Sequence, residues 1–184
     1  MSIVDQFRNY RSTKLGKIAK WLVKIGIAAD HLTFLSLSSG LAAIYFLFNN
    51  YYLFALFALL HLLFDGFDGV VARVTKPTGY GKYFDLMSDS AFTFLALLKA
   101  GLFLQEFYAY IAAGLFLSAL MIHLKSTLRA PMLFMRTVFV IVLLIIAYPL
   151  FPFTAMAVTA GYLAAGGVSL YSLSRQLQWY MGKK

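Results

Sequence analysis

The 184-residue sequence contains no cysteine, which excludes disulfide bonds and thiolate metal sites. Charged residues are also scarce, at 12% of the chain, whereas hydrophobic residues make up 61% and aromatic residues 17%. The mean hydropathy of +0.77 lies far above what a soluble domain needs to fill one core. The composition therefore predicts an integral membrane protein.

Six segments are long and apolar enough to cross a hydrocarbon core, which requires about 20 apolar residues. Breaks that contain polar residues, glycine or proline separate them. The predicted spans are 32–48, 51–73, 83–104, 107–124, 131–148 and 152–173. The expected fold is therefore all-α, with six transmembrane helices in a single domain over residues 31–184.

Lysine and arginine occur on every second connection between these spans. They precede the first span, lie between the second and third and around the turn between the fourth and fifth, and follow the sixth. The other three connections carry none. Because Lys and Arg accumulate on cytoplasmic loops, this pattern predicts a multi-pass protein of the cell membrane with both termini in the cytoplasm. It also accounts for the net charge of +9 without a nucleic-acid partner.

Residues 1–30 form a different kind of segment. Basic residues recur there at helical spacing, at positions 8, 11, 14, 17, 20 and 24, and apolar residues occupy other faces. This pattern is typical of an amphipathic helix that lies in the membrane interface against anionic headgroups. The alternative is a basic tail that only sets the topology.

Acidic residues are few, and most of them gather in one place. Of the seven Asp and Glu residues, four fall in the stretches "DGFDGVVAR" and "DLMSD": Asp65, Asp68, Asp85 and Asp89. Spacings of i, i+3 and i, i+4 put each pair on one helical face, with Gly69 and Ala72 beside the first pair and Gly81 before the second. Because a short connection makes the two helices antiparallel neighbours, these faces can meet.

Four converging carboxylates require cations, because burying an unpaired charge costs several kcal/mol. The expected ligands are carboxylate oxygens, because no His or Cys lies at ligand spacing. Such a set of ligands suits Mg²⁺ or Mn²⁺ rather than Zn²⁺. Two divalent ions would neutralise four carboxylates, and paired metals are a recurring device for in-line phosphoryl displacement. Arg73 follows the first pair at the cytoplasmic end of its helix, where it can meet a phosphate.

Intramembrane carboxylates also mark proton or cation pathways, so a transporter is an alternative of another class. Transport sites lie near the bilayer midplane, often on broken helices. The acids in this sequence instead cluster at the predicted cytoplasmic ends of two helices, beside a basic loop. Their depth therefore favours phosphoryl-transfer chemistry.

The segment "DGFDGVVARVTKPTGYGKYFDLMSD" resembles the signature of the CDP-alcohol phosphotransferase, or CDP-alcohol phosphatidyltransferase, family. In that signature D-x-x-D-G-x-x-A-R is followed, after a short loop, by G-x-x-x-D-x-x-x-D. All eight defined positions are matched in order. The six-helix layout with an N-terminal interfacial helix is also that of the family.

The resemblance implies a transferase of phospholipid biosynthesis, which moves a phosphoalcohol group from a CDP-linked lipid to a small alcohol and releases CMP. It implies two Mg²⁺ per active site, for which Mn²⁺ can substitute, held by Asp65, Asp68, Asp85 and Asp89. Asp89 would also accept the proton of the attacking hydroxyl. A homodimer and an active site at the cytoplasmic face are implied as well.

Two further groups of residues are expected to contact substrates. For the CDP-lipid, the resemblance implies Asp68, Gly69, Ala72, Arg73 and Gly81, with Asp30, Thr33 and Thr78 as additional candidates. For the acceptor, Lys125, Arg129 and Arg136 supply more positive charge on the active-site side than topology requires. They would suit a phosphorylated acceptor such as inositol phosphate or glycerol phosphate. Serine or another uncharged alcohol is the alternative acceptor.

Overall fold

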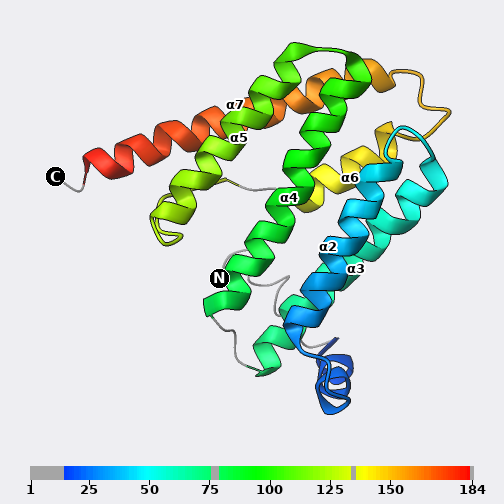
Figure 1. Cartoon of the computed structure of the whole chain (residues 1–184), viewed down its shortest axis with the longest axis vertical. Coiled ribbons are helices and arrows are strands. Elements are labelled where there is room, and N and C mark those ends of the chain that lie inside the picture. The colour runs from blue at the N-terminus through cyan, green and yellow to red at the C-terminus, as the bar shows by residue number, and fades with distance from the viewer. Residues whose placement is uncertain (1–14, 76–78, 134–135, 183–184) are drawn as a thin grey trace. The chain divides into compact units, whose positions relative to one another are not determined.

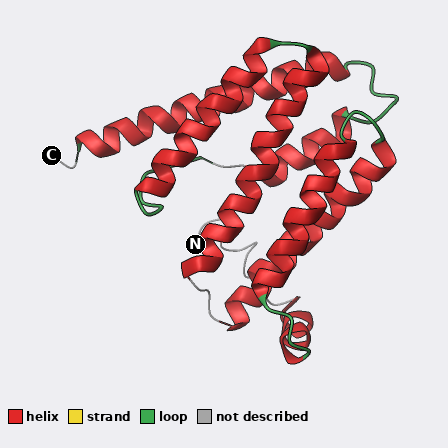
Figure 2. Ribbon diagram, viewed as in Figure 1, coloured by secondary structure: helices red, strands yellow, loops and turns green. Residues whose placement is uncertain are grey.

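The computed structural model describes residues 15–75, 79–133 and 136–182, and these residues form helices and no strand. Figure 2 shows the helices joined by short loops. An N-terminal helix, Leu15–Lys24, is followed by α2 (Ala29–Phe46), α3 (Tyr51–Thr75), α4 (Gly79–Leu104), α5 (Phe107–Lys125), α6 (Arg136–Ile146) and α7 (Thr154–Met181). The predicted all-α fold is confirmed.

Among the described residues, four helices are each long and apolar enough to cross a membrane: α3, α4, α5 and α7. The N-terminal helix and α2 pass the same test only together, with a bend of 105° between them. The helix α6 has 11 residues, which corresponds to about 16 Å, whereas a hydrocarbon core is about 30 Å thick. Several apolar helices thus indicate a multi-pass membrane protein, but the fifth predicted span, 131–148, contains a helix shorter than expected.

The first of two compact units comprises Met1–Ala43 and Ala55–Asp89. Within it, α2 and α3 lie side by side and run antiparallel (Figure 1). Its core combines Ala19 of the N-terminal helix, Leu32 of α2, and Val70 and Val71 of α3. These apolar contacts hold the N-terminal helix against the pair formed by α2 and α3.

The N-terminal helix ends at a glycine cap. Gly26 has a φ of 85°, a left-handed conformation that glycine adopts without strain, and the N–H of Ile27 donates to the carbonyl of Leu22 at 3.0 Å. Ile18, Trp21 and Ile25 on this helix and its cap are exposed. The segment therefore presents large apolar side chains to its surroundings next to exposed lysines.

The second unit comprises Ile44–Phe54 and Ser90–Lys184, and α5 packs along α7 within it. Small residues let these two helices approach, because a Cβ added at Gly166 would lie 3.4 Å from the Cβ of Ala112. The amide of Gln176 donates to the carbonyl of Ala119 at 3.0 Å. The hydroxyl of Tyr162 donates to the carboxylate of Glu106, just before α5.

Candidate functional site

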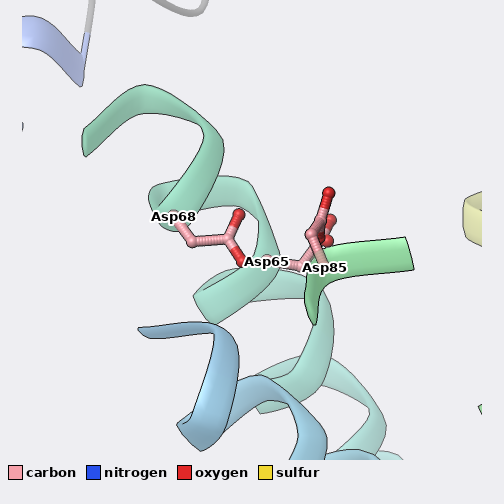
Figure 3. A group of neighbouring side chains, drawn as sticks. All are labelled: Asp65, Asp68 and Asp85. Carbon is pink, nitrogen blue, oxygen red and sulfur yellow. The ribbon is translucent and has the colours of Figure 1, made fainter. Parts of the chain in front are cut away.

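Two helices bring three carboxylates together in the first unit. The helix α3 carries Asp65 and Asp68, and α4 carries Asp85 (Figure 3). One oxygen of each lies within 4.8 Å of the others. The spacing of i, i+3 places the first two on one face of α3, and the face of α4 that carries Asp85 meets it. The predicted convergence is therefore observed for these three residues.

The surroundings and chemistry of this group fit a hard divalent cation. Asp68 is buried, with 5% of its surface exposed, and Asp65 and Asp85 are half-buried. Three carboxylates at this separation repel one another unless a cation or a proton compensates their charge. The group contains oxygen donors and neither His nor Cys, which suits Mg²⁺ or Mn²⁺.

Asp89 lies one helical turn beyond Asp85 on α4 and is half-buried. The two residues share a face of the helix, as their i, i+4 spacing predicts. Asp89 is outside the group of three described carboxylates that meet within 4.8 Å. Its place in a four-carboxylate centre therefore stays a prediction.

Asp68 has a hydrogen-bond partner on α2 that its spacing on α3 did not indicate. The hydroxyl of Thr33 donates to Oδ2 of Asp68 at 2.9 Å, and Thr33 is itself buried. The sequence had suggested Thr33 only as a contact of the nucleotide. In the structure it is also a partner of a carboxylate in the candidate metal group.

A cavity of about 170 Å³ opens beside these carboxylates. Its lining includes Asp68, Asp85 and five residues predicted to bind the CDP-lipid, namely Asp30, Thr33, Gly69, Ala72 and Gly81. Glycine and alanine leave room there for a ligand next to the backbone. The cavity and the carboxylates thus form one site within the first unit.

The cavity also has lining residues that the sequence interpretation missed. These are Ala28, Ala29, Thr75 and Lys82. Lys82 belongs to the basic connection between the second and third predicted spans, which the sequence indicates only as a topology signal. Its position three residues before Asp85 puts both on one face of α4, so helical periodicity could have assigned it to the site.

Among the described residues that were predicted to bind the CDP-lipid, Arg73 alone does not line the cavity. Arg73 is exposed in the last turn of α3. Thr78 lies outside the described residues. The expected contacts of these two with the CDP-lipid stay predictions.

The three predicted acceptor residues belong to the second unit. Lys125 ends α5 and is exposed, Arg129 is exposed in the following turn, and Arg136 begins α6 and is buried. In this turn Thr127 and Leu128 have φ values of 54° and 63°, a conformation that is uncommon for residues other than glycine. The hydroxyl of Ser126 stabilises the turn, since it accepts from the N–H of Ala130 at 2.8 Å.

Comparison with known proteins identifies the family. The sequence model of the CDP-alcohol phosphatidyltransferase family matches residues 26–170. The chain belongs to this family. The match contains the carboxylates and the cavity of this CDP-alcohol phosphatidyltransferase as well as its three candidate acceptor residues.

A solved structure supports the fold. The crystal structure of the phosphatidylinositol phosphate synthase of Mycobacterium tuberculosis in apo form aligns with a TM-score of 0.69 over 88% of this chain and 93% of that chain. The two sequences are 20% identical, so this similarity concerns the fold alone. Comparison with curated proteins gives no match.

Membership of the family decides between the two functional classes that intramembrane carboxylates left open. The protein is a transferase of phospholipid biosynthesis rather than a transporter. Its substrates are those of a CDP-alcohol phosphatidyltransferase, a CDP-alcohol donor and an alcohol acceptor.

Proposed function

We propose that the protein transfers a phosphatidyl-type group from a CDP-linked lipid alcohol to a small phosphorylated alcohol and releases CMP. The observation that supports this most is the group formed by Asp65, Asp68 and Asp85, whose oxygens lie within 4.8 Å of one another beside a cavity. These carboxylates occupy the acidic positions of the family signature. The site therefore contains carboxylates that would bind cations and a cavity that would hold the nucleotide.

The proposed cofactor is a pair of Mg²⁺ ions, for which Mn²⁺ can substitute. Asp65, Asp68, Asp85 and Asp89 would hold these ions. When bound, the ions would neutralise the diphosphate and stabilise the charge of the departing CMP. The observed convergence of three of these carboxylates supports this assignment.

The remaining chemistry belongs to the chain's own residues. The hydroxyl oxygen of the acceptor attacks the phosphorus that carries the lipid, and the bond between that phosphorus and the oxygen of CMP breaks. Asp89 takes the proton of the attacking hydroxyl on a carboxylate oxygen. Because little covalent chemistry is required of the protein, holding donor and acceptor in line supplies most of the catalysis.

The donor would occupy the cavity beside the carboxylates. Gly69 and Gly81 lack side chains there, so the cytidine and the diphosphate can approach the backbone. Arg73 and Lys82 would supply positive charge to the diphosphate. Asp30, Thr33 and Thr78 complete the proposed set, Thr33 with the additional contact to Asp68.

We propose six transmembrane spans in one catalytic domain, residues 31–184, with α6 as part of the fifth span, 131–148, and we propose that residues 1–30 lie in the membrane interface. The 105° bend between Leu15–Lys24 and α2 supports this, because it turns the N-terminal helix away from the direction of a span. Exposed Trp21 is also typical of an interfacial segment.

The charge pattern supports an active site at the cytoplasmic face, with both termini on that side. Asp68 is seven residues from the end of α3 at Thr75, or about 10 Å along the helix axis. This depth is shallower than the middle of a hydrocarbon core about 30 Å thick. A water-soluble acceptor could therefore reach the carboxylates from the cytoplasm. We also propose a homodimer, as the family resemblance implies.

The acceptor can be identified by measuring CMP release from CDP-diacylglycerol, or from an archaeal CDP-lipid, with a panel of alcohols. We expect inositol phosphate or glycerol phosphate to support turnover and serine not to. Arg129→Ala should raise the KM for the acceptor by roughly 10- to 100-fold, because a lost charge-assisted contact is worth about 1.5–3 kcal/mol.

Arg175→Ala, which changes another exposed arginine of the second unit, is the matched control and should leave this KM unchanged. Turnover with serine, together with a wild-type KM in Arg129→Ala, would favour the uncharged acceptor instead. No CMP release with any alcohol would contradict the proposed reaction.

A further inference from the structure

Two polar contacts connect α2 and α3 in the first unit. The first is the hydrogen bond from Thr33 to Oδ2 of Asp68, at 2.9 Å. The second joins Ser36, one turn further along α2, to His61, which lies two turns before Asp68 on α3. All four side chains are buried. The contacts therefore fix α2 against the helix that carries two of the three clustered carboxylates.

The contact between Ser36 and His61 is formed by several atoms. Nδ1 of His61 lies 2.9 Å from the carbonyl oxygen of Ser36 and 2.9 Å from its hydroxyl oxygen. The hydroxyl of Ser36 also donates to the carbonyl of His61 at 3.2 Å. Because a carbonyl oxygen only accepts, Nδ1 carries the proton, and this fixes the ring's tautomer and its orientation. The pair thus defines one relative position of the two helices.

Stability alone does not account for such a contact. His61 has 0% of its surface exposed and Ser36 has 1%. Apolar side chains of similar volume at these positions would bury their surface without desolvating polar atoms. A hydrogen bond has a narrow range of distance and angle, so it specifies the register of two helices more sharply than apolar packing does.

The register, meaning the position of α2 along α3, matters because Thr33 lies on the same face of α2 as Ser36 and bonds to Asp68. A shift of α2 along α3 by half a helical turn, about 2.7 Å, would carry the hydroxyl of Thr33 from 2.9 Å to beyond hydrogen-bond distance of Oδ2. Oδ2 of Asp68 would then lose the partner that holds it, and the carboxylate could rotate. Partners that hold a metal-binding carboxylate determine how well the cation binds.

We propose that Ser36 and His61 are positioning residues for the candidate metal centre. They set the register in which Thr33 holds Oδ2 of Asp68, and Thr33 in turn fixes how this carboxylate faces Asp65 and Asp85. The inference rests on the proposed role of these carboxylates as cation ligands. It adds α2 to the centre as a support that binds no cation itself.

The test is Mn²⁺ binding to the purified full chain, followed by electron paramagnetic resonance. Thr33→Val and Ser36→Ala should weaken the Mn²⁺ affinity by about 10-fold, the lower end of the effect of removing a partner of a metal ligand. Thr33→Ser keeps the hydroxyl and should keep the affinity. Ser38→Ala is the matched control, because the hydroxyl of Ser38 is exposed and bonds only within α2, to the carbonyl of Phe34.

Activity provides a second readout. Ser36→Ala should raise the Mg²⁺ concentration needed for half-maximal activity, and excess Mg²⁺ should restore the wild-type rate. The KM for the CDP-lipid at saturating Mg²⁺ should not change. Because excess cation also stabilises a folded protein that binds it, a melting temperature in EDTA equal to that of the wild type is needed to separate positioning from stability. His61→Phe, which keeps a ring of similar size but removes the donor, should behave like Ser36→Ala.

Each outcome is decisive. An Mn²⁺ affinity in both Ser36→Ala and His61→Phe equal to that of Ser38→Ala would overturn the proposal. A loss in Thr33→Val alone would overturn the part that concerns register. If the wild type binds no Mn²⁺, or if Asp68→Asn leaves the affinity unchanged, the proposed metal centre itself is wrong and this inference is wrong with it.

Discussion

Gly69 forms part of the cavity wall on α3, where its lack of a side chain leaves space for the proposed nucleotide. We expect Gly69→Leu to fill this space and to weaken binding of CMP by at least 10-fold, about 1.4 kcal/mol, because an overlap of even one side chain with a ligand is costly. Calorimetry with CMP in the presence of Mg²⁺ measures the change.

Gly66 provides the control for this substitution. It lies on the same helix, no atom outside its own helical segment lies within 4 Å of where its Cβ would be, and it does not line the cavity. Gly66→Leu should therefore keep the wild-type affinity for CMP. If both variants bind CMP as the wild type does, the cytidine site lies elsewhere.

The carboxylates show what a sequence can predict at the level of residues. Asp65, Asp68 and Asp85 could be expected to meet, because helical periodicity sets their faces and a short connection makes α3 and α4 neighbours. The contact between Thr33 and Asp68 could not be expected. It depends on how α2 is rotated against α3, and α2 carries apolar residues on all its sides, so hydropathy does not indicate which side faces inward.

Two helices extend beyond the predicted spans at one end. The helix α4 begins at Gly79 rather than at 83, and α7 continues to Met181 rather than ending at 173. Hydropathy marks the part of a helix that suits hydrocarbon, whereas a helix continues into the aqueous phase as long as its backbone hydrogen bonds are satisfied. A prediction based on the length of apolar segments therefore misses the polar residues at the ends of a helix.

The helix α6 deviates in the opposite direction. It covers 136–146 of the predicted span 131–148. Pro131 and Pro149 lie beyond its two ends, and proline cannot donate the backbone hydrogen bond that a helix interior requires. Apolar composition alone did not distinguish this short helix from a full span.

The sidedness of the connecting loops can be measured directly, because the chain has no cysteine of its own. In intact cells, a thiol reagent that does not cross membranes should label Gln105→Cys, between α4 and α5, and should not label Thr127→Cys, between α5 and α6. The reason is the clustering of Lys and Arg around the second loop. Permeabilised cells, in which both positions should react, provide the control.

The opposite labelling pattern would contradict the proposed orientation. If both positions are labelled in intact cells, the two loops lie on the same side of the membrane. The single helix between them, α5, would then not cross the membrane, which would contradict the proposal. Both substituted residues are exposed, so poor access within the protein would not mask the result.

The chain consists mostly of apolar helices, and its first unit contains one small group of charged and polar residues. Of the seven acidic residues in the chain, three meet beside the cavity, and a fourth lies one turn away on α4. The family assignment indicates which reaction these residues support, and the cavity beside them provides space for the CDP-alcohol donor. We propose that these carboxylates hold the divalent cations on which the transfer depends.

The most direct test of this claim is CMP release by the purified protein as Mg²⁺ is titrated, with the wild type compared to Asp65→Asn and Asp85→Asn. We predict that EDTA abolishes activity in the wild type and that Mg²⁺ or Mn²⁺ restores it. Each variant should lose at least about 100-fold in activity while it still purifies as a folded protein, because an amide cannot replace the charge of a carboxylate that holds a cation. Wild-type activity in EDTA, or in either variant, would contradict the account.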